Sequence, residues 1–168
     1  RKLLPPGALA ALNANDVPPT NADGSLPLVP NSDLFYLSGI EQEESLLVLS
    51  PDAPDEKLRE ILFLREPNEH LKTWEGHKLS KDEATQISGI RTVKWLSELP
   101  SVWRGPMCDA AEVSLNSNEH QRAVVDVQSR DARFIEVCRR EYPLHTYRRL
   151  APLLHQLRLV KSAAEVDV

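Results

Sequence analysis

The stretch SLLVLSPDAPDEKLREILFL, residues 45–64, contains two short apolar runs, LLVL at residues 46–49 and ILFL at residues 61–64. Neither run alternates with polar residues, and continuous apolar runs of this length are typical of strands covered on both faces. Between them, Pro51 and Pro54 lack a backbone N–H and have a fixed φ, which predicts a loop. The stretch therefore predicts two buried strands of an α/β fold.

Further short strands are predicted on both sides of this stretch. Eight of the thirteen prolines fall at or before Pro54, and the segments between them at residues 8–13 and 33–37 predict strands. Residues 109–115 predict another strand in the second half of the chain. The first third of the chain is thus interpreted as strands joined by proline-containing loops.

The second half favours helices. Ser80 is a predicted N-cap for a helix that ends near Gly89. Residues 129–142 predict the clearest helix, and an amphipathic segment at residues 95–103 is predicted to be interrupted by Pro100. The predicted apolar face of the helix at residues 129–142 comprises Phe134, Ile135, Val137, Cys138 and Tyr142.

Both ends of the sequence indicate a piece of a longer protein. The chain opens with Arg1 and has Met107 as its single methionine. Near the other end, Ser162 and Glu165 have the spacing of a capping box, which begins a helix. Helices shorter than about a dozen residues are marginal in water, so we expect a continuation beyond Val168.

Composition excludes some classes of protein. The net charge is -5, with 41% hydrophobic, 27% charged and 5% aromatic residues, which is typical of one globular domain. No apolar run approaches the roughly twenty residues of a membrane span. The acidic total gives no general reason to expect a nucleic-acid partner. We therefore predict neither a membrane nor a nucleic acid as partner.

The C-terminal part is an exception to the acidic balance. Its arginines could form a phosphate-binding stripe, but no aromatic residues alternate with them for base stacking. We interpret them as a solvated face or as a seam against an acidic partner surface. The residues concerned are Arg130, Arg133, Arg139, Arg140, Arg148, Arg149 and Arg158.

Motifs of known catalytic chemistry are absent from the sequence. It contains no GxGxxG, GxxxxGK[ST], GxSxG or HExxH pattern. Cys108 and Cys138 form no CxxC pair, so we expect buried free thiols and a cytoplasmic location. Glu69, His70 and His77 could hold a metal only if the fold brought them together, and surface polar residues are the alternative.

A segment near the N-terminus changes this picture. NSDLFYLSGI, residues 31–40, resembles the NSDxxYLTG-like signature of the aminopeptidase P (Xaa-Pro aminopeptidase) N-terminal domain. Four further segments resemble that family in the same order: EQEESLLVL at residues 41–49, ILFLRE at 61–66, TWEGHKL at 73–79 and LRLVKSAAEVDV at 157–168. The matching motif residues include Asn31, Ser32, Tyr36, Gly39 and Gly76.

The resemblance implies a two-domain parent protein. Residues 1–157 would form the N-terminal domain of the creatinase and prolidase type, an α/β fold with a mixed β-sheet flanked by helices and a ribonuclease H-like motif. Residues 158–168 would start a linker helix into a C-terminal pita-bread domain. There, two aspartates, a histidine and two glutamates would hold two manganese ions, which polarise the peptide carbonyl and activate water. The resemblance implies no catalytic residue, metal or cofactor in this chain.

The implied role of this chain is oligomer assembly and substrate gating. Its implied partners are its own catalytic domain, further copies in a dimer or tetramer, and short Xaa-Pro peptides as substrate. Trp74 is the candidate for reaching a neighbouring subunit's cleft, with a place in the domain's own core as the alternative. Asp33 is a candidate for a salt bridge to the catalytic domain, with a turn-capping role as the alternative.

Some features keep other interpretations open. Val29 and Pro30 stand where many relatives have arginine and glutamine, so a contact of that arginine is in doubt. A prolidase has a related N-terminal domain, and a histone chaperone carries one on a pseudo-enzyme that binds protein partners. The sequence alone does not separate these from an aminopeptidase.

Overall fold

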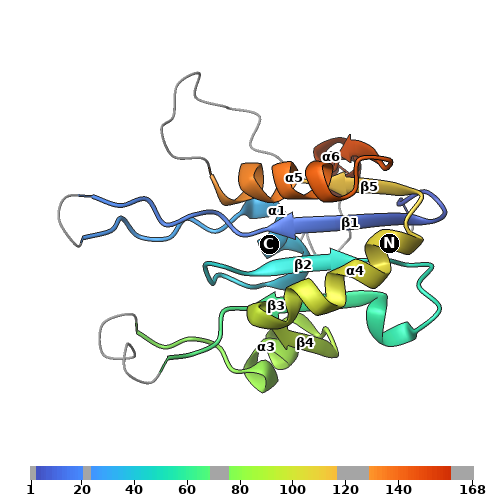
Figure 1. The fold of residues 1–168 in the computed structure, drawn as a ribbon. Helices are drawn as coiled ribbons and strands as arrows, with labels where there is room; N and C mark the ends of the chain where they lie inside the picture. Colours follow the sequence, from blue (N-terminus) through green and yellow to red (C-terminus); the bar gives the residue numbers. More distant parts are fainter. Residues whose placement is uncertain (1–2, 21–23, 69–75, 117–128, 160–168) are drawn as a thin grey trace.

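The computed structural model describes residues 3–20, 24–68, 76–116 and 129–159. Its centre is a six-stranded sheet in the order β4-β3-β2-β1-β5-β6 (Figure 1). The strands are β1 (Ala8–Asn13), β2 (Leu46–Leu49), β3 (Glu60–Leu64), β4 (Thr92–Trp95), β5 (Glu112–Leu115) and β6 (Thr146–Arg149). β2 runs antiparallel to β1 and β3, and the other neighbouring pairs are parallel. The predicted mixed sheet is confirmed.

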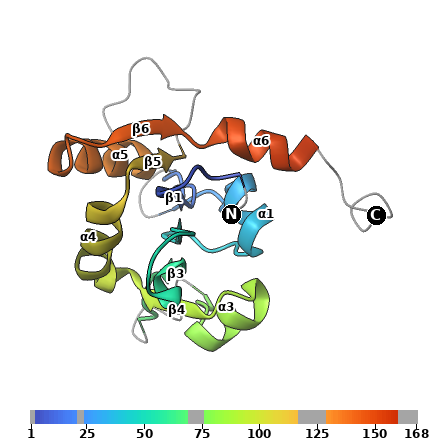
Figure 2. The ribbon, with the colours of Figure 1, turned by 90° about the vertical axis from the view of Figure 1, so that its right-hand side faces the viewer.

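Helices cover both faces of this sheet (Figure 2). One face carries α1 (Ser32–Ser38), α3 (Lys81–Ser88) and α6 (Ala151–Leu159). The opposite face carries α4 (Leu99–Asp109) and α5 (Arg130–Glu141). Two short 3-10 helices, η1 (Glu56–Leu58) and η2 (Leu96–Glu98), lie beside β3 and β4. No helix among the described residues is long and apolar enough to cross a bilayer.

The continuous apolar runs supply two cores at once. Successive side chains of a strand point to opposite faces, so Leu62 and Leu64 of β3 join one core while Ile61 and Phe63 join the other. We call the side with α1, α3 and α6 the first core, built on Leu12, Leu34, Leu47, Leu62, Ala84 and Leu154. The second core, under α4 and α5, is built on Leu9, Val48, Phe63, Trp103, Met107 and Cys138. The prediction of strands covered on both faces is confirmed.

The predicted strand at residues 33–37 is wrong, because these residues lie in α1. The Asn31 side chain accepts hydrogen bonds from the N–H groups of Asp33 and Leu34, at 3.1 and 3.0 Å, and so caps the helix. Gly39 ends it with φ of +68° in the left-handed region. These start and stop signals are present in the sequence.

The second half also differs in detail from the prediction. Pro100 does not interrupt a helix but occupies the first turn of α4, where a missing N–H costs nothing. The predicted strand at residues 109–115 is shorter, because Asp109 closes α4 and β5 starts at Glu112. β4, β6 and α6 were not predicted.

The remaining helix predictions largely hold. α3 has the predicted Ser80 cap, completed as a capping box by Glu83. α5 packs on the second core, but Val137 is 38% exposed and not part of its buried face. Of the two cysteines predicted to be buried, Cys138 is buried and Cys108 is exposed. The predicted capping box at residues 162–165 lies outside the described residues.

Candidate functional site

The motif at residues 31–40 builds α1 and joins it to the loop after β1. Besides capping the helix, Asn31 donates from Nδ2 to the Asn15 side-chain oxygen, at 3.1 Å. Asn15 donates in turn to the carbonyl oxygen of Val29, at 3.0 Å. The asparagine of the motif therefore holds the start of α1 and the end of β1 together. Val29, one of the two departures from the family pattern, takes part in this contact through its backbone only.

Asp33 faces the other end of the described chain. Its Oδ1 lies 3.0 Å from Nη1 of Arg158, in the last turn of α6, and the same guanidinium lies 3.4 Å from the Ser32 hydroxyl. The Arg158 guanidinium also lies over the Tyr36 ring, 6.0 Å from its centroid. The side-chain cap of α1 is Asn31, whereas Asp33 lies in the first turn of the helix and pairs with Arg158, the first residue of the predicted linker. The predicted salt bridge of Asp33 to a catalytic domain stays a prediction.

The two glycines of the motifs have positive φ. Gly39 has φ of +68°, and a Cβ there would lie 3.3 Å from Cγ2 of Ile87 in α3. A side chain at this position would therefore be strained and would press on α3. Gly76 has φ of +73° with open space around it. Trp74, the predicted substrate-proximal residue, lies outside the described residues.

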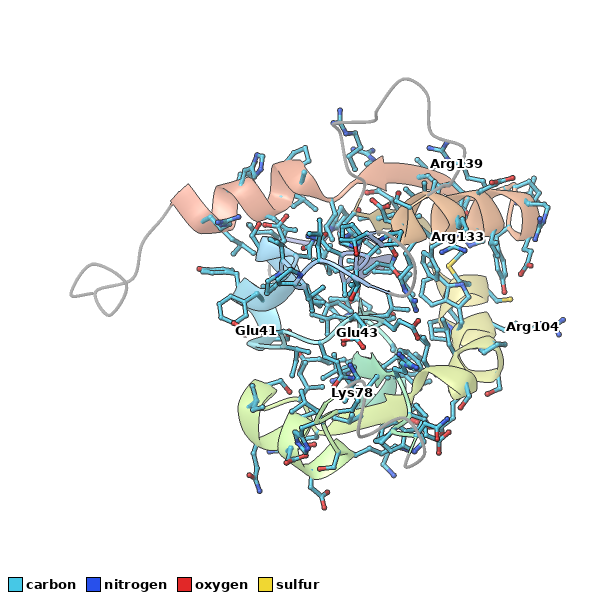
Figure 3. All side chains as sticks on the ribbon, turned by 90° about the vertical axis from the view of Figure 1, so that its left-hand side faces the viewer. Glu41, Glu43, Lys78, Arg104, Arg133 and Arg139 are labelled. Atoms are coloured by element: carbon cyan, nitrogen blue, oxygen red, sulfur yellow. The ribbon has the colours of Figure 1, made fainter. Side chains whose placement is uncertain are left out.

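Charged residues form a network at one end of the strands β2 and β3. Glu43 and Glu44 precede β2, and Arg65 follows β3, so antiparallel pairing brings all three to the same end of these two strands. Glu43 Oε1 pairs with Nζ of Lys78 and lies 3.6 Å from Nη1 of Arg65. Glu44 lies 3.9 Å from Arg65 and 4.0 Å from Arg130 of α5. Figure 3 shows Glu43 and Lys78 near one another below α1.

This network was not predicted from the sequence. A signal existed, because a hairpin-like antiparallel pair of strands places the residues before the first strand opposite the residues after the second. Burial lowers the pKa of the Arg130 guanidinium, while Glu44 opposes that change. The arrangement is a set of paired charges that ties the segment at Lys78 to the sheet and α5.

The C-terminal arginines do not form one stripe. They lie on α5, β6 and α6, and several pair with acids of this chain. Arg148 lies 2.7 Å from Glu112 of β5, and Arg140 lies 3.7 Å from Glu141. Arg104, an exposed arginine of α4, points outward in Figure 3. This distribution fits the predicted solvated face, with the addition that some of these arginines pair with acids of this chain.

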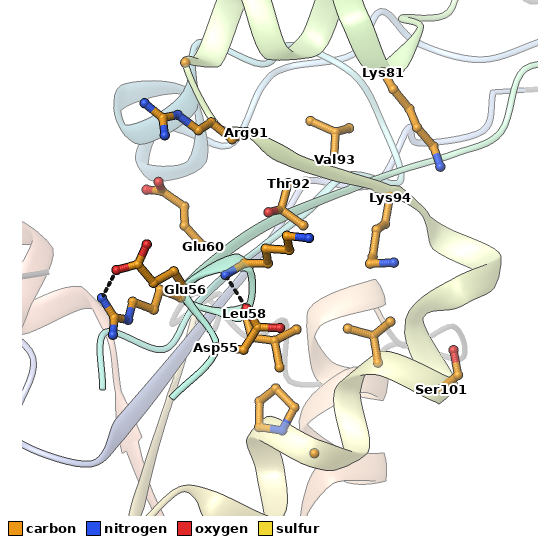
Figure 4. A pocket seen from close by; sticks show the side chains of 16 residues that line it. Asp55, Glu56, Leu58, Glu60, Lys81, Arg91, Thr92, Val93, Lys94 and Ser101 are labelled. Atoms are coloured by element: carbon orange, nitrogen blue, oxygen red, sulfur yellow. Dashed lines mark hydrogen bonds and ion pairs between the residues drawn. The ribbon is translucent and has the colours of Figure 1, made fainter. Parts of the chain in front are cut away.

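An open groove of about 1260 Å³ lies between η1, the edge strand β4 and α4 (Figure 4). Several of its charged residues form ion pairs: Arg59 lies 3.3 Å from Glu56, and Lys81 and Lys94 lie 3.2 and 3.3 Å from Glu98, which stands next to the groove lining. The backbone N–H of Trp95, then the two lysines, lower the pKa of Glu98 to about 2. A carboxylate held ionised by so many donors is poorly suited to act as a general acid or base near neutral pH.

A metal site has little support among the described side chains. His77 Nε2 lies 3.0 Å from Glu83 Oε1, while Glu69 and His70 lie outside the described residues. Within the described part, no three His, Cys, Asp or Glu side chains lie together as metal ligands would. The described residues therefore do not fit a two-metal centre.

Comparison with known proteins gives consistent matches. The family model for the aminopeptidase P N-terminal domain matches residues 1–113. An Xaa-Pro aminopeptidase of Escherichia coli is 26% identical over 166 residues, covering 98% of this chain and 37% of that protein. A mitochondrial intermediate cleaving peptidase 55 of Arabidopsis thaliana is 26% identical over 169 residues, covering 99% of this chain and 31% of that protein.

The fold comparison agrees with these sequence matches. A Bacillus anthracis structure assigned as an aminopeptidase P has a TM-score of 0.87 at 23% identity, covering 99% of this chain and 39% of that chain. The chain thus spans between 31% and 39% of the length of these relatives. On the sequence match and the shared fold, this chain belongs to the aminopeptidase P N-terminal domain family.

Proposed function

We propose that this chain is the non-catalytic N-terminal domain of an Xaa-Pro aminopeptidase and that it serves assembly and substrate gating. The observation that carries the proposal is the family match to an N-terminal domain, in a chain that spans 37% of the E. coli Xaa-Pro aminopeptidase. The remaining length of such a protein is ample for a separate catalytic domain. We propose that residues 158–168 lead into that domain.

The proposed peptidase chemistry belongs to the domain that follows. A manganese pair needs several carboxylate and imidazole ligands in one place. In the described part of this chain no such group exists, and His77 is engaged by Glu83. The role of this chain's residues is therefore to support and shape, and no catalytic step is assigned to them.

The gating role is proposed for the segment around Trp74. Gly76 follows this segment with φ of +73°. Lys78, two residues further on, pairs with Glu43 and so fixes the chain to the sheet directly after the segment. An indole there would restrict a neighbouring subunit's cleft in a dimer or tetramer. Trp74→Ala in the oligomeric enzyme should raise KM or widen peptide length preference without altering metal content.

The direct test separates this chain from its parent. With added Mn²⁺, the purified 168-residue chain should not hydrolyse Xaa-Pro peptides, whereas the gene product that continues past Val168 should do so and lose activity to a chelator. Robust turnover by the 168-residue chain alone would overturn the proposal.

The same test distinguishes the alternatives. Cleavage confined to Xaa-Pro dipeptides would indicate a prolidase. A longer product without metal ligands that binds histone-like basic peptides would indicate the pseudo-enzyme. The cytoplasm is our proposed location, and import of the longer product into mitochondria would instead match the Arabidopsis relative.

A further inference from the structure

Helix α1 leaves an apolar surface uncovered beside α3. Phe35 of α1 is 43% exposed, and Ile87 of α3 is 52% exposed. Phe35 lies four residues before Gly39, on the same side of the helix, and a Cβ at Gly39 would lie 3.3 Å from Ile87. Helices α1 and α3 are in contact on the same face of the sheet, so the two exposed side chains lie on neighbouring helices, and we call the surface that they form the Phe35–Ile87 surface.

The end of α6 is attached to the other side of α1. The Arg158 guanidinium pairs with Asp33 at 3.0 Å and lies over the ring of Tyr36, which is itself 41% exposed. Asp33 and Tyr36 are three residues apart, so they share one side of α1. α6 ends at Leu159, one residue after this contact. Figure 2 shows the last turn of α6 beside α1.

We propose that the Phe35–Ile87 surface is the docking site for the domain that follows α6 in the same chain. This inference rests on the proposed function, which supplies that domain. Arg158 holds the last turn of α6 against α1, the helix that carries Phe35, so the described chain ends beside the helix that forms half of this surface. The partner is expected to present apolar side chains here, with Asp33 and Arg158 at the rim of the contact.

Size and tethering favour this occupant over a second copy. Two side chains and the adjacent tyrosine contribute a few hundred Å², well below the roughly 800 Å² that each partner of a stable free interface buries. A tethered domain needs less area, because a short linker raises the effective concentration to about the millimolar range. The surface is thus large enough for an intramolecular contact.

Thiol labelling tests the assignment in solution. In a Cys108→Ser background, Phe35→Cys and Ile87→Cys each introduce one reactive thiol. Cys138 stays silent, because it is buried and burial raises its thiol pKa to about 12. The matched control is Leu144→Cys, at a position that is 97% exposed in the turn between α5 and β6. Labelling rates are compared between the 168-residue chain and the gene product that continues past Val168.

We expect positions 35 and 87 to react at least about ten-fold more slowly in the longer product, with position 144 unchanged, since access governs thiol reactivity. Equal rates at positions 35 and 87 in both proteins would overturn the proposal. Protection that appears in the 168-residue chain and grows with its concentration would assign the surface to a second copy instead.

Activity on Xaa-Pro peptides is measured on the same longer product. Full activity without protection at positions 35 and 87 refutes the docking site alone. Protection without peptidase activity refutes the proposed function alone.

Discussion

The two faces of the sheet are completed in different ways. On the second core, aromatic residues close the structure: Trp103 and Phe134 pack edge to face with centroids 5.2 Å apart. The Tyr147 hydroxyl donates to the carbonyl oxygens of Cys138 and Tyr142, at 2.7 and 2.9 Å. On the first core, α1 is held by a cap and an ion pair while Phe35 stays exposed.

This difference shows which face is complete by itself. The second core packs its aromatic rings within the chain, and backbone oxygens accept from the Tyr147 hydroxyl. The first core buries its strand residues equally well but leaves apolar side chains on the outer surface of α1 and α3. On this face, polar contacts hold the helices in place and apolar side chains remain exposed to solvent. Exposed apolar side chains that lie together are typical of an interface.

The largest expected effect compares two aromatic residues on opposite faces. Trp103→Ala should lower the free energy of unfolding of this chain by about 3–5 kcal/mol, because it empties a buried aromatic site. The matched change Phe35→Ala should alter it by no more than about 0.5 kcal/mol, because the ring is already exposed to solvent. Urea unfolding measures both. Equal costs would contradict the contrast between the faces.

A second comparison concerns the caps of two helices. Asn31→Ala removes the acceptor of two backbone N–H groups of α1 and should cost about 0.5–2 kcal/mol. Ser129→Ala is the control on the opposite face, because the Ser129 side chain accepts no backbone hydrogen bond from α5. It should change the free energy of unfolding by less than about 0.5 kcal/mol. A larger loss from Ser129→Ala would show that α5 depends on its cap after all.

A third test addresses the contact that joins the two faces around β4. The Glu98 carboxylate accepts from Trp95 N–H and from Lys81 of α3, and its pKa falls from 4.5 to about 2. A lowered folded-state pKa adds stability above pH 4.5, and this stability is lost as the pH falls from 4.5 towards 2.

Glu98→Gln should therefore destabilise the chain at pH 6 and match the wild type near pH 2. Its side chain is 37% exposed, so solvent screening limits the difference to about 1 kcal/mol. Chemical unfolding across this pH range measures it. A difference that persists undiminished at low pH would show that the effect does not come from the ionised carboxylate.

The smallest expected effect concerns the ion pair between α1 and α6. A double-mutant cycle with Asp33→Asn and Arg158→Gln should give a coupling of about 0.2–1 kcal/mol, because both groups are partly exposed. The coupling should weaken in high salt. The pair Glu112 and Arg148, on neighbouring strands, is the comparison. A coupling of zero for Asp33 and Arg158 would leave α6 held by apolar packing alone.

Local patterns predicted the parts of the fold that local physics controls. The runs at residues 46–49 and 61–64 are apolar at every position, so only strands with cover on both faces could bury them. The helix after Ser80 has its cap and its glycine stop within ten residues. Residues 33–37 were predicted as a strand but lie in a helix, although Asn31 is a typical N-cap and Gly39 a typical helix stop. Tertiary contacts were not needed to correct it.

The site residues were only partly predictable. Asp33 was predicted to pair with the catalytic domain, and the ion pair that the structure shows is with Arg158 of this chain, which lies 125 positions away and is connected to Asp33 by no local pattern. The strands β4 and β6 are only partly buried, so their apolar signal is weak. The network of Glu43, Arg65 and Lys78 depends on which strands are neighbours, which is a property of the sheet.

The sequence by itself determined the family, the alternation of strands and helices, and the double-sided burial of β2 and β3. These features depend on residue type and spacing, which act over a few positions. The tertiary structure alone decided that Asp33 pairs with a residue of α6 and that the charged residues at the ends of β2 and β3 form ion pairs. It also decided that Phe35 and Ile87 lie on neighbouring helices of one face. Such contacts join distant segments, because strand order and helix packing, not local propensity, bring them together.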